Sequence, residues 1–61
     1  MPRQGQYAKI YQNPLLREGY RGDAILIEKK VENSMYEYWL CEFPDTGEKS
    51  VRRLVKYDYG L

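Results

Sequence analysis

The sequence contains no histidine and only one cysteine, Cys41. A single cysteine cannot form a disulfide within the chain, and a zinc site would have to combine that thiolate with carboxylates alone. Small extracellular domains usually depend on disulfides or metals, so we expect a reducing, cytoplasmic location and neither a metal nor a cofactor. No apolar run approaches the roughly 20 residues of a membrane-spanning helix. The sequence therefore predicts no association with a membrane.

The chain is short, with 61 residues, and this allows one domain. A domain of this size buries only about 60% of its unfolded surface, so its core must be rich in aromatic residues or shared with a partner. Seven tyrosines, one tryptophan and one phenylalanine supply the large side chains. We expect a flexible segment at residues 1–6, a single domain over residues 7–57 and a tail at residues 58–61.

Charge is unevenly distributed, although the net charge is only +1. Residues 1–22 carry four cationic side chains and one carboxylate, and residues 49–61 carry the same numbers. Residues 23–48 carry two cationic side chains and seven carboxylates. Two basic ends that lay side by side in the fold would make the molecule an electrostatic dipole.

The segment 36–55 has the pattern of a β-hairpin. Two sets of side chains alternate at period two, with Trp39, Cys41 and Phe43 on one face and Tyr36, Tyr38 and Leu40 on the other. Between the strands, Pro44 suits the second position of a turn and Gly47 suits a left-handed conformation after it. We expect the Trp39 face to form the floor of the core.

The return strand of this hairpin alternates too, but its inward face is ambiguous, because both sets contain apolar residues. We expect Val51 and either Val55 or Leu54 to point inward, and a bend near Arg53 would allow Val51 and Leu54 to do so together.

Two further strands precede the hairpin. Residues 7–12 alternate with Ile10 inward, and Asn13 followed by Pro14 indicates a turn. Residues 15–21 are expected to form a connection in which Leu15, Leu16 and Tyr20 pack over an open end of the core. Residues 22–32 form the second strand; helix is the competing interpretation of 28–30, but the preceding glycine and the short length favour a strand.

Four or five short antiparallel strands with turn signals between them predict an all-β fold closed into a small barrel. The segments Gly22-Asp23-Ala24-Ile25-Leu26-Ile27 and 37–47 together resemble an SH3-like barrel of the Tudor and chromo-barrel type. The whole chain also resembles small proteins encoded by phages and mobile elements. The Tudor resemblance implies an aromatic cage for a methylated lysine, but Trp39 faces away from Tyr36 and Tyr38.

The exposed aromatic residues suggest two binding surfaces. The first is a protein-binding or self-association patch made of Tyr36, Tyr38 and Leu40. The second is a nucleic-acid surface at the chain ends, made of Tyr7, Lys9, Tyr11, Arg52, Arg53, Lys56 and Tyr57. The alternative for the tyrosines is that they cover a thin core with their hydroxyl groups in water.

Catalysis is not expected from this composition. Cys41 lies between two core aromatic residues and has no histidine to act as its base, so it is interpreted as a core residue. Glu37 and Glu42 are five residues apart on one strand, so they lie on opposite faces and are interpreted as solvated charges. The sequence predicts a binding protein that takes no small-molecule substrate.

Overall fold

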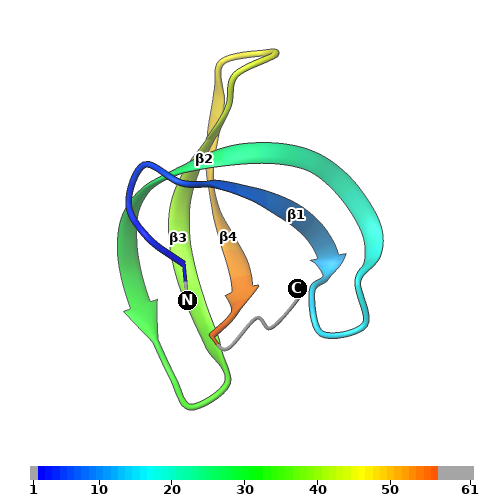
Figure 1. Cartoon of the computed structure of the whole chain (residues 1–61), viewed down its shortest axis with the longest axis vertical. Helices are drawn as coiled ribbons and strands as arrows, with labels where there is room; N and C mark the ends of the chain where they lie inside the picture. The colour runs from blue at the N-terminus through cyan, green and yellow to red at the C-terminus, as the bar shows by residue number, and fades with distance from the viewer. Residues whose placement is uncertain (1, 57–61) are drawn as a thin grey trace.

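The computed structural model describes residues 2–56, which form one antiparallel sheet. The strands are β1 (Tyr7–Asn13), β2 (Glu18–Glu32), β3 (Tyr36–Phe43) and β4 (Glu48–Val55). Their order in the sheet is the order in the chain, so each strand pairs with the next through a hairpin (Figure 1). Residues 22–32 are strand, as predicted, and the predicted antiparallel pairing of β2 with β3 is confirmed.

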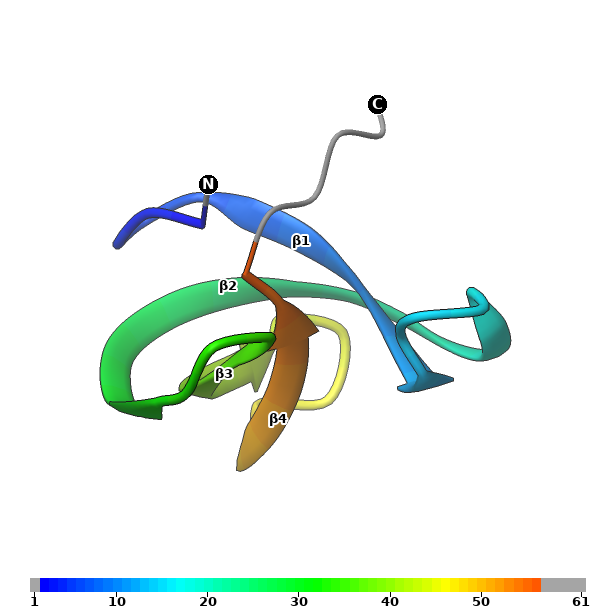
Figure 2. The same cartoon turned by 90° about the horizontal axis from the view of Figure 1, so that it is seen from below.

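The sheet curls because β2 is long and irregular. This strand has 15 residues, and its register shifts once against β1 and twice against β3. Such bulges increase the local twist and bend the strand. β2 therefore wraps around the molecule and carries β1 across the face of β3 and β4 (Figures 1 and 2). The prediction of an all-β fold is confirmed: four antiparallel strands form a half-barrel that is consistent with a small SH3-like barrel.

The core lies on the inner face of this curl, and all four strands contribute to it. The buried apolar residues are Ile10, Ala24, Leu26, Trp39, Cys41 and Leu54, with Ala8 and Phe43 packed against them. Trp39 is 5% exposed and Cys41 is fully buried, so the predicted inward face of the hairpin is confirmed. Ile10 is fully buried too, as predicted for the first strand.

Glu37 is also buried in the core, with only 2% of its surface exposed. The indole Nε1 of Trp39 donates a hydrogen bond of 2.9 Å to Glu37 Oε1. A buried polar group is costly unless it is paired, and this bond satisfies one atom of each side chain. The interpretation of Glu37 as a solvated charge was therefore wrong, while the prediction that Glu42 lies on the other face is confirmed by its half-buried outer position.

The inward face of β4 differs from the prediction. Leu54 is 7% exposed and lies opposite Glu37, whereas Val51 is 50% exposed and lies opposite Leu40. β4 pairs with β3 without a register shift, so residues of one parity share a face and no bend turns Val51 inward. Val51 belongs to the outer face.

The connection between β1 and β2 is shorter than predicted. β1 continues to Asn13 and β2 begins at Glu18, so only residues 14–17 lie between them. Arg17 adopts a positive φ of 56°, which closes this tight turn.

Three residues of this region do not cover the core, contrary to the prediction. Leu15 is 53% exposed, Leu16 is 63% exposed and Tyr20 is 55% exposed. The tight turn extends away from the core, and Pro14 is its buried residue.

The segment before β1 is hydrogen-bonded to β2. The Gly5 N–H donates to the Leu26 carbonyl at 2.7 Å, and the Leu26 N–H donates to the Gln6 carbonyl at 2.9 Å. The predicted tail at residues 58–61 lies outside the described residues. Within residues 2–56, no helix has the length and apolar character needed to cross a membrane.

The pairing of β1 with β2 depends on a glycine. Gly19 has a φ of 71°, and a Cβ placed there would lie 2.8 Å from the Cβ of Gln12. Gly47 has a similar φ of 76° but no heavy atom within 4 Å of such a Cβ. We expect Gly19→Ala to lower the free energy of unfolding by about 1–3 kcal/mol more than Gly47→Ala does, because only the first adds a steric clash. Urea denaturation of both variants measures this difference, and equal losses would contradict it.

Candidate functional site

The outer face of β3 and β4 carries a continuous apolar surface. Leu40 lies directly opposite Val51, and Tyr36 lies opposite Val55. Val31 of β2 lies opposite Tyr38 on the other side of β3. We call this surface the outer patch: it consists of Val31, Tyr36, Tyr38, Leu40, Val51 and Val55.

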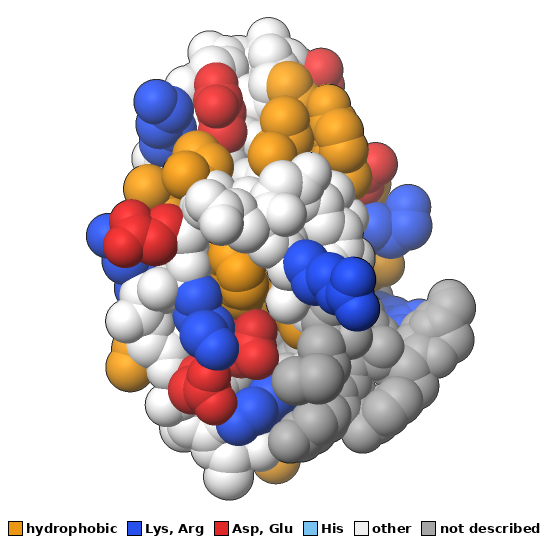
Figure 3. All heavy atoms as spheres, turned by 60° about the vertical axis from the view of Figure 1, so that its left-hand side comes forward, with side chains coloured by type: hydrophobic (Ala, Val, Ile, Leu, Met, Phe, Trp, Pro, Cys, Tyr) orange, Lys and Arg blue, Asp and Glu red, His pale blue; other side chains and the backbone are white. Residues whose placement is uncertain are grey.

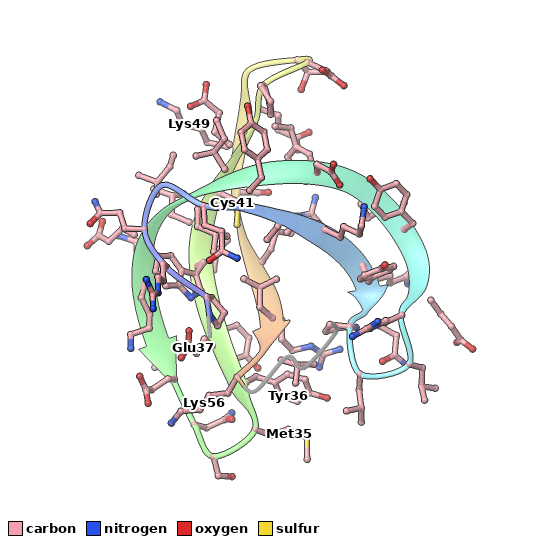
Figure 4. The ribbon with its side chains drawn as sticks, in the orientation of Figure 1. Met35, Tyr36, Glu37, Cys41, Lys49 and Lys56 are labelled. Carbon is pink, nitrogen blue, oxygen red and sulfur yellow. The ribbon has the colours of Figure 1, made fainter. Side chains whose placement is uncertain are left out.

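The outer patch is accessible to solvent at its margins. Val31 is 58% exposed and Val51 is 50% exposed, while Tyr36, Tyr38 and Leu40 are half-buried between them. Met35, 48% exposed, precedes Tyr36 in the turn that leads into β3 (Figure 4). The structure thus brings the three predicted protein-binding residues together on one face and adds valines to them.

Charged side chains of opposite sign border the outer patch. On the β4 side, Arg53 lies opposite Tyr38 and its guanidinium carbon is 4.5 Å from the centre of the Tyr36 ring. On the β2 side, Glu28 lies opposite Leu40 and accepts a hydrogen bond from Lys30.

The β1 residues predicted to bind nucleic acid lie next to a carboxylate. Lys9 Nζ is 3.9 Å from Asp23 Oδ1 and 5.8 Å from the centre of the Tyr20 ring. The Tyr11 and Tyr20 ring centres are 5.6 Å apart. Tyr20 donates a hydrogen bond of 2.5 Å to Asp23, and this bond is the main reason why the pKa of Tyr20 is raised. The positive charge of Lys9 is therefore partly neutralised.

Tyr7, the remaining β1 residue of that prediction, is 59% exposed and lies opposite Ile25. It shares the outer side of the sheet with Lys9, since the two are separated by one residue. Tyr57 lies outside the described residues.

The two consecutive arginines of β4 lie on opposite faces. Arg52 lies opposite Trp39 on the inner side, where its Nε donates to Ser50 Oγ at 3.0 Å and its guanidinium carbon is 5.4 Å from the centre of the Phe43 ring. Arg53 is on the outer side. The predicted nucleic-acid residues therefore do not form one surface; on the face shown in Figure 3, acidic and basic side chains are likewise interspersed.

Lys56 belongs to an ion cluster at the end of β2. Its Nζ donates to Glu32 Oε2 at 2.6 Å, while Lys29 Nζ donates to Glu32 Oε1 at 2.5 Å. Hydrogen bonds from Lys29 and Lys56 lower the pKa of Glu32 to about 2. The same Glu32 bond raises the pKa of Lys29, with a smaller contribution from the charge of Glu37.

An opening lies between the β1–β2 turn and β4. Its volume is about 450 Å³, and it is lined by Gln12, Asn13, Glu18, Gly19 and Arg53. Sequence reasoning missed this opening because it joins residues far apart in the chain. Sequence reasoning also missed Val31 and Val51 on the outer patch. For Val51, an outward position was one of the two possibilities that the alternation in β4 left open.

Comparison with known proteins finds no matching family model, no similar curated protein and no similar solved structure.

Glu32 should titrate in a pH range set by its two lysines. Its pKa is lowered from 4.5 to about 2 in the folded state, so its contribution to stability is complete above about pH 4.5 and is lost as the pH falls through about 2. We expect Lys29→Met or Lys56→Met to raise the Glu32 pKa toward 4.5, as measured by carboxyl carbon NMR shifts. Lys30→Met is the matched control, because Lys30 pairs with Glu28 instead. A wild-type Glu32 pKa near 4.5 would show that the cluster does not form.

Cys41 should be unreactive in the native state. Burial raises the pKa of its thiol, with the charge of Arg52 opposing, and the thiol hydrogen bonds to the Trp39 carbonyl at 3.3 Å. Because the thiolate is the reactive form and only opened molecules expose it, we expect modification by Ellman's reagent to be roughly a hundredfold slower or more in the native protein than in denaturant. A Cys41→Ser, Ser34→Cys variant, with its thiol in an exposed turn, should react rapidly when native. Equal native rates for the two proteins would refute the burial.

Proposed function

We propose that this chain is a small non-catalytic binding module that associates with a second copy of itself through the outer patch. The observation that supports this proposal most directly is an apolar surface continuous across three strands, with Val31 58% exposed and Val51 50% exposed at its margins. Burying apolar surface stabilises an interface by about 25 cal/mol per Å². A 61-residue chain with a thin core gains from sharing apolar surface in this way.

The charges around the outer patch favour a second copy as the occupant. Its β4 side carries Arg53, and its β2 side carries Glu28. A twofold axis along the middle strand of the outer patch lays the β4 side of one copy over the β2 side of the other, so Arg53 of each copy comes within reach of Glu28 of the other. Such an interface is closed, and it produces a dimer rather than a filament.

The fold family, the origin and the cellular location of the chain are proposals as well. The half-barrel supports descent from SH3-like barrels of the Tudor and chromo-barrel type, and origin in a phage or mobile element rests on sequence resemblance. A cytoplasmic location is supported by the unpaired Cys41.

Nucleic-acid binding is the second candidate function. It is favoured by Tyr7 and Lys9, which share an outer face, with Tyr11 beside Tyr20. It is weakened by the ion pairs of Lys9 with Asp23 and of Lys56 with Glu32, because paired cations have less charge to offer to phosphate.

Sedimentation velocity tests self-association. We expect wild-type protein to sediment as a dimer at tens of micromolar and Tyr38→Glu to raise the dimer dissociation constant by about tenfold or more, because it places a charge in the centre of the buried patch. Val31→Glu should also raise the dimer dissociation constant. Val31 is 58% exposed, so the folded monomer tolerates a glutamate there. Leu16→Glu is the matched control, since Leu16 is 63% exposed in a turn outside the outer patch.

A charge exchange tests the arrangement of the two copies. Arg53→Glu should weaken the dimer, and Arg53→Glu combined with Glu28→Arg should restore it, because the exchange recreates the contact with opposite signs. A wild-type protein that stays monomeric at hundreds of micromolar, or a Tyr38→Glu variant that dimerises normally, overturns the proposal.

A further inference from the structure

β4 is the last strand of the sheet, and its outer edge has no partner among residues 2–56. One edge of β4 forms a complete ladder with β3, from Glu48 opposite Phe43 to Val55 opposite Tyr36. β1, at the other end of the sheet, is not paired with β4 (Figure 1). An edge strand presents a row of backbone N–H and C=O groups that can pair with an extended chain.

The cationic side chains of this edge strand differ from the lysines of β1 and β2 in their ion pairs. Lys9, Lys29 and Lys30 each form an ion pair with a carboxylate, at 3.9, 2.5 and 3.1 Å respectively. By contrast, no carboxylate of residues 2–56 forms an ion pair with Lys49, Arg52 or Arg53. The chemistry of the edge therefore favours an acidic partner.

Aromatic rings support the two arginines. The Arg53 guanidinium carbon lies 4.5 Å from the centre of the Tyr36 ring, and that of Arg52 lies 5.4 Å from the centre of the Phe43 ring. Stacking restricts the guanidinium group and leaves N–H groups at its edge to bind a carboxylate with two hydrogen bonds. Less conformational entropy is then lost when a carboxylate binds.

The two arginines reach opposite faces of the sheet, and this distinguishes one kind of acidic partner from another. Arg52 lies opposite Trp39 on the inner face and Arg53 lies opposite Tyr38 on the outer face. A peptide that extends the sheet also alternates its side chains between the faces, so two consecutive acidic residues would reach one arginine each. The phosphates of a nucleic-acid strand do not alternate about a sheet edge in this way.

Space is present beside Arg53. The opening of about 450 Å³ between the β1–β2 turn and β4 has Arg53 on one wall and Gln12, Asn13, Glu18 and Gly19 on the other. The amide side chains of Gln12 and Asn13 can bond to a peptide backbone there. Lys49 lies toward the opposite end of β4, beside the β3–β4 turn (Figure 4).

We propose that the free edge of β4 binds an extended peptide segment with two consecutive acidic residues, which adds as a fifth strand and places one carboxylate on Arg52 and the next on Arg53. The peptide backbone supplies affinity through the ladder, and the two arginines supply the preference for acidic sequence. This site is separate from the proposed self-association, which uses the outer face. Arg53 borders both surfaces, so Arg52, on the inner face, is the residue that distinguishes them.

Fluorescence anisotropy with labelled decapeptides tests the site. The acidic probe has the sequence TVTVEEVTVT, and the matched probes have TVTVQQVTVT, TVTVKKVTVT and TVPVEEVPVT. We expect the acidic probe to bind at least about tenfold more tightly than the glutamine and lysine probes, because only its carboxylates form charge-assisted hydrogen bonds. The proline probe keeps the charge but cannot complete the ladder, so it should also bind at least about tenfold more weakly.

Protein variants assign the two contacts. Arg52→Ala and Arg53→Ala should each weaken binding of the acidic probe by roughly tenfold and reduce its advantage over the glutamine probe. Arg3→Ala, at an exposed arginine before β1 that does not line the opening, is the matched control. Arg52→Lys, which keeps the charge but lacks the planar fork of the guanidinium group, should bind the acidic probe with intermediate affinity. Circular dichroism of each variant verifies the fold.

Three results would overturn the proposal. The first is equal affinity for the acidic and proline probes, which would mean that charge alone, without a strand, explains binding. The second is an Arg52→Ala variant that binds the acidic probe as wild type does. The third is a ten-nucleotide single-stranded DNA that displaces the acidic probe at lower concentration than the unlabelled peptide does, which would assign the arginines to nucleic acid. None of these readouts depends on the dimer: a Val31→Glu monomer, which is changed on β2 and not beside either arginine, should still bind the acidic probe.

Discussion

The burial of one tryptophan with its polar atom satisfied is the interaction on which the rest of this fold depends. Trp39 is the largest side chain of the core, and its indole N–H donates to Glu37, two residues earlier on the same strand. Without that acceptor the N–H would be buried unpaired, and without the N–H the Glu37 carboxylate would lose a donor in a site that is 2% exposed. The two residues therefore have to be buried together, and they define the inner face of β3 at every other position.

The remaining core residues are small or of medium size and surround this ring. Cys41, Ala24, Leu26 and Ile10 are each 0% exposed, and they come from three strands. The chain has no disulfide to help close the curl, so the curvature of β2 has to bring β1 over β3. The bulges between Leu26 and Glu28 and between Lys29 and Val31 produce this curvature, and they lie where the strand passes from apolar to charged sequence. The same irregularity that closes the core leaves β1 and β4 as separate edges.

A sheet of four strands cannot hide both of its faces and both of its edges. The inner face is filled by the core, while the outer patch and the edge of β4 retain surface that a partner can cover. The distribution of ion pairs matches this division: several lysines of β1 and β2 are bonded to Asp23, Glu28 and Glu32, whereas the arginines of β4 rest on aromatic rings. Binding through β3 and β4 is therefore the function that we propose.

Much of the hairpin could be predicted from the sequence, because its signals are local. Alternation placed Trp39 and Cys41 on one face, and the turn after Phe43 forms as expected: the Gly47 N–H donates to the Phe43 carbonyl at 2.7 Å and Gly47 is left-handed. Local signals failed where both possible inward faces of a strand contained apolar residues, or where burial depends on residues that are distant in the sequence. Leu54 and Val51 could not be separated until β4 was paired with Glu37 and Leu40 of β3.

By itself, then, the sequence determined an all-β chain, its strand periodicity, the turn chemistry and the inward face of its tryptophan strand, since each follows from neighbours within a few residues. Only the tertiary structure decided which polar groups are buried, where the sheet bends and which cations remain without a carboxylate. Those properties arise from pairing across strands, and the side chain that pairs with Lys9 or Arg53 is set by register rather than by adjacent sequence.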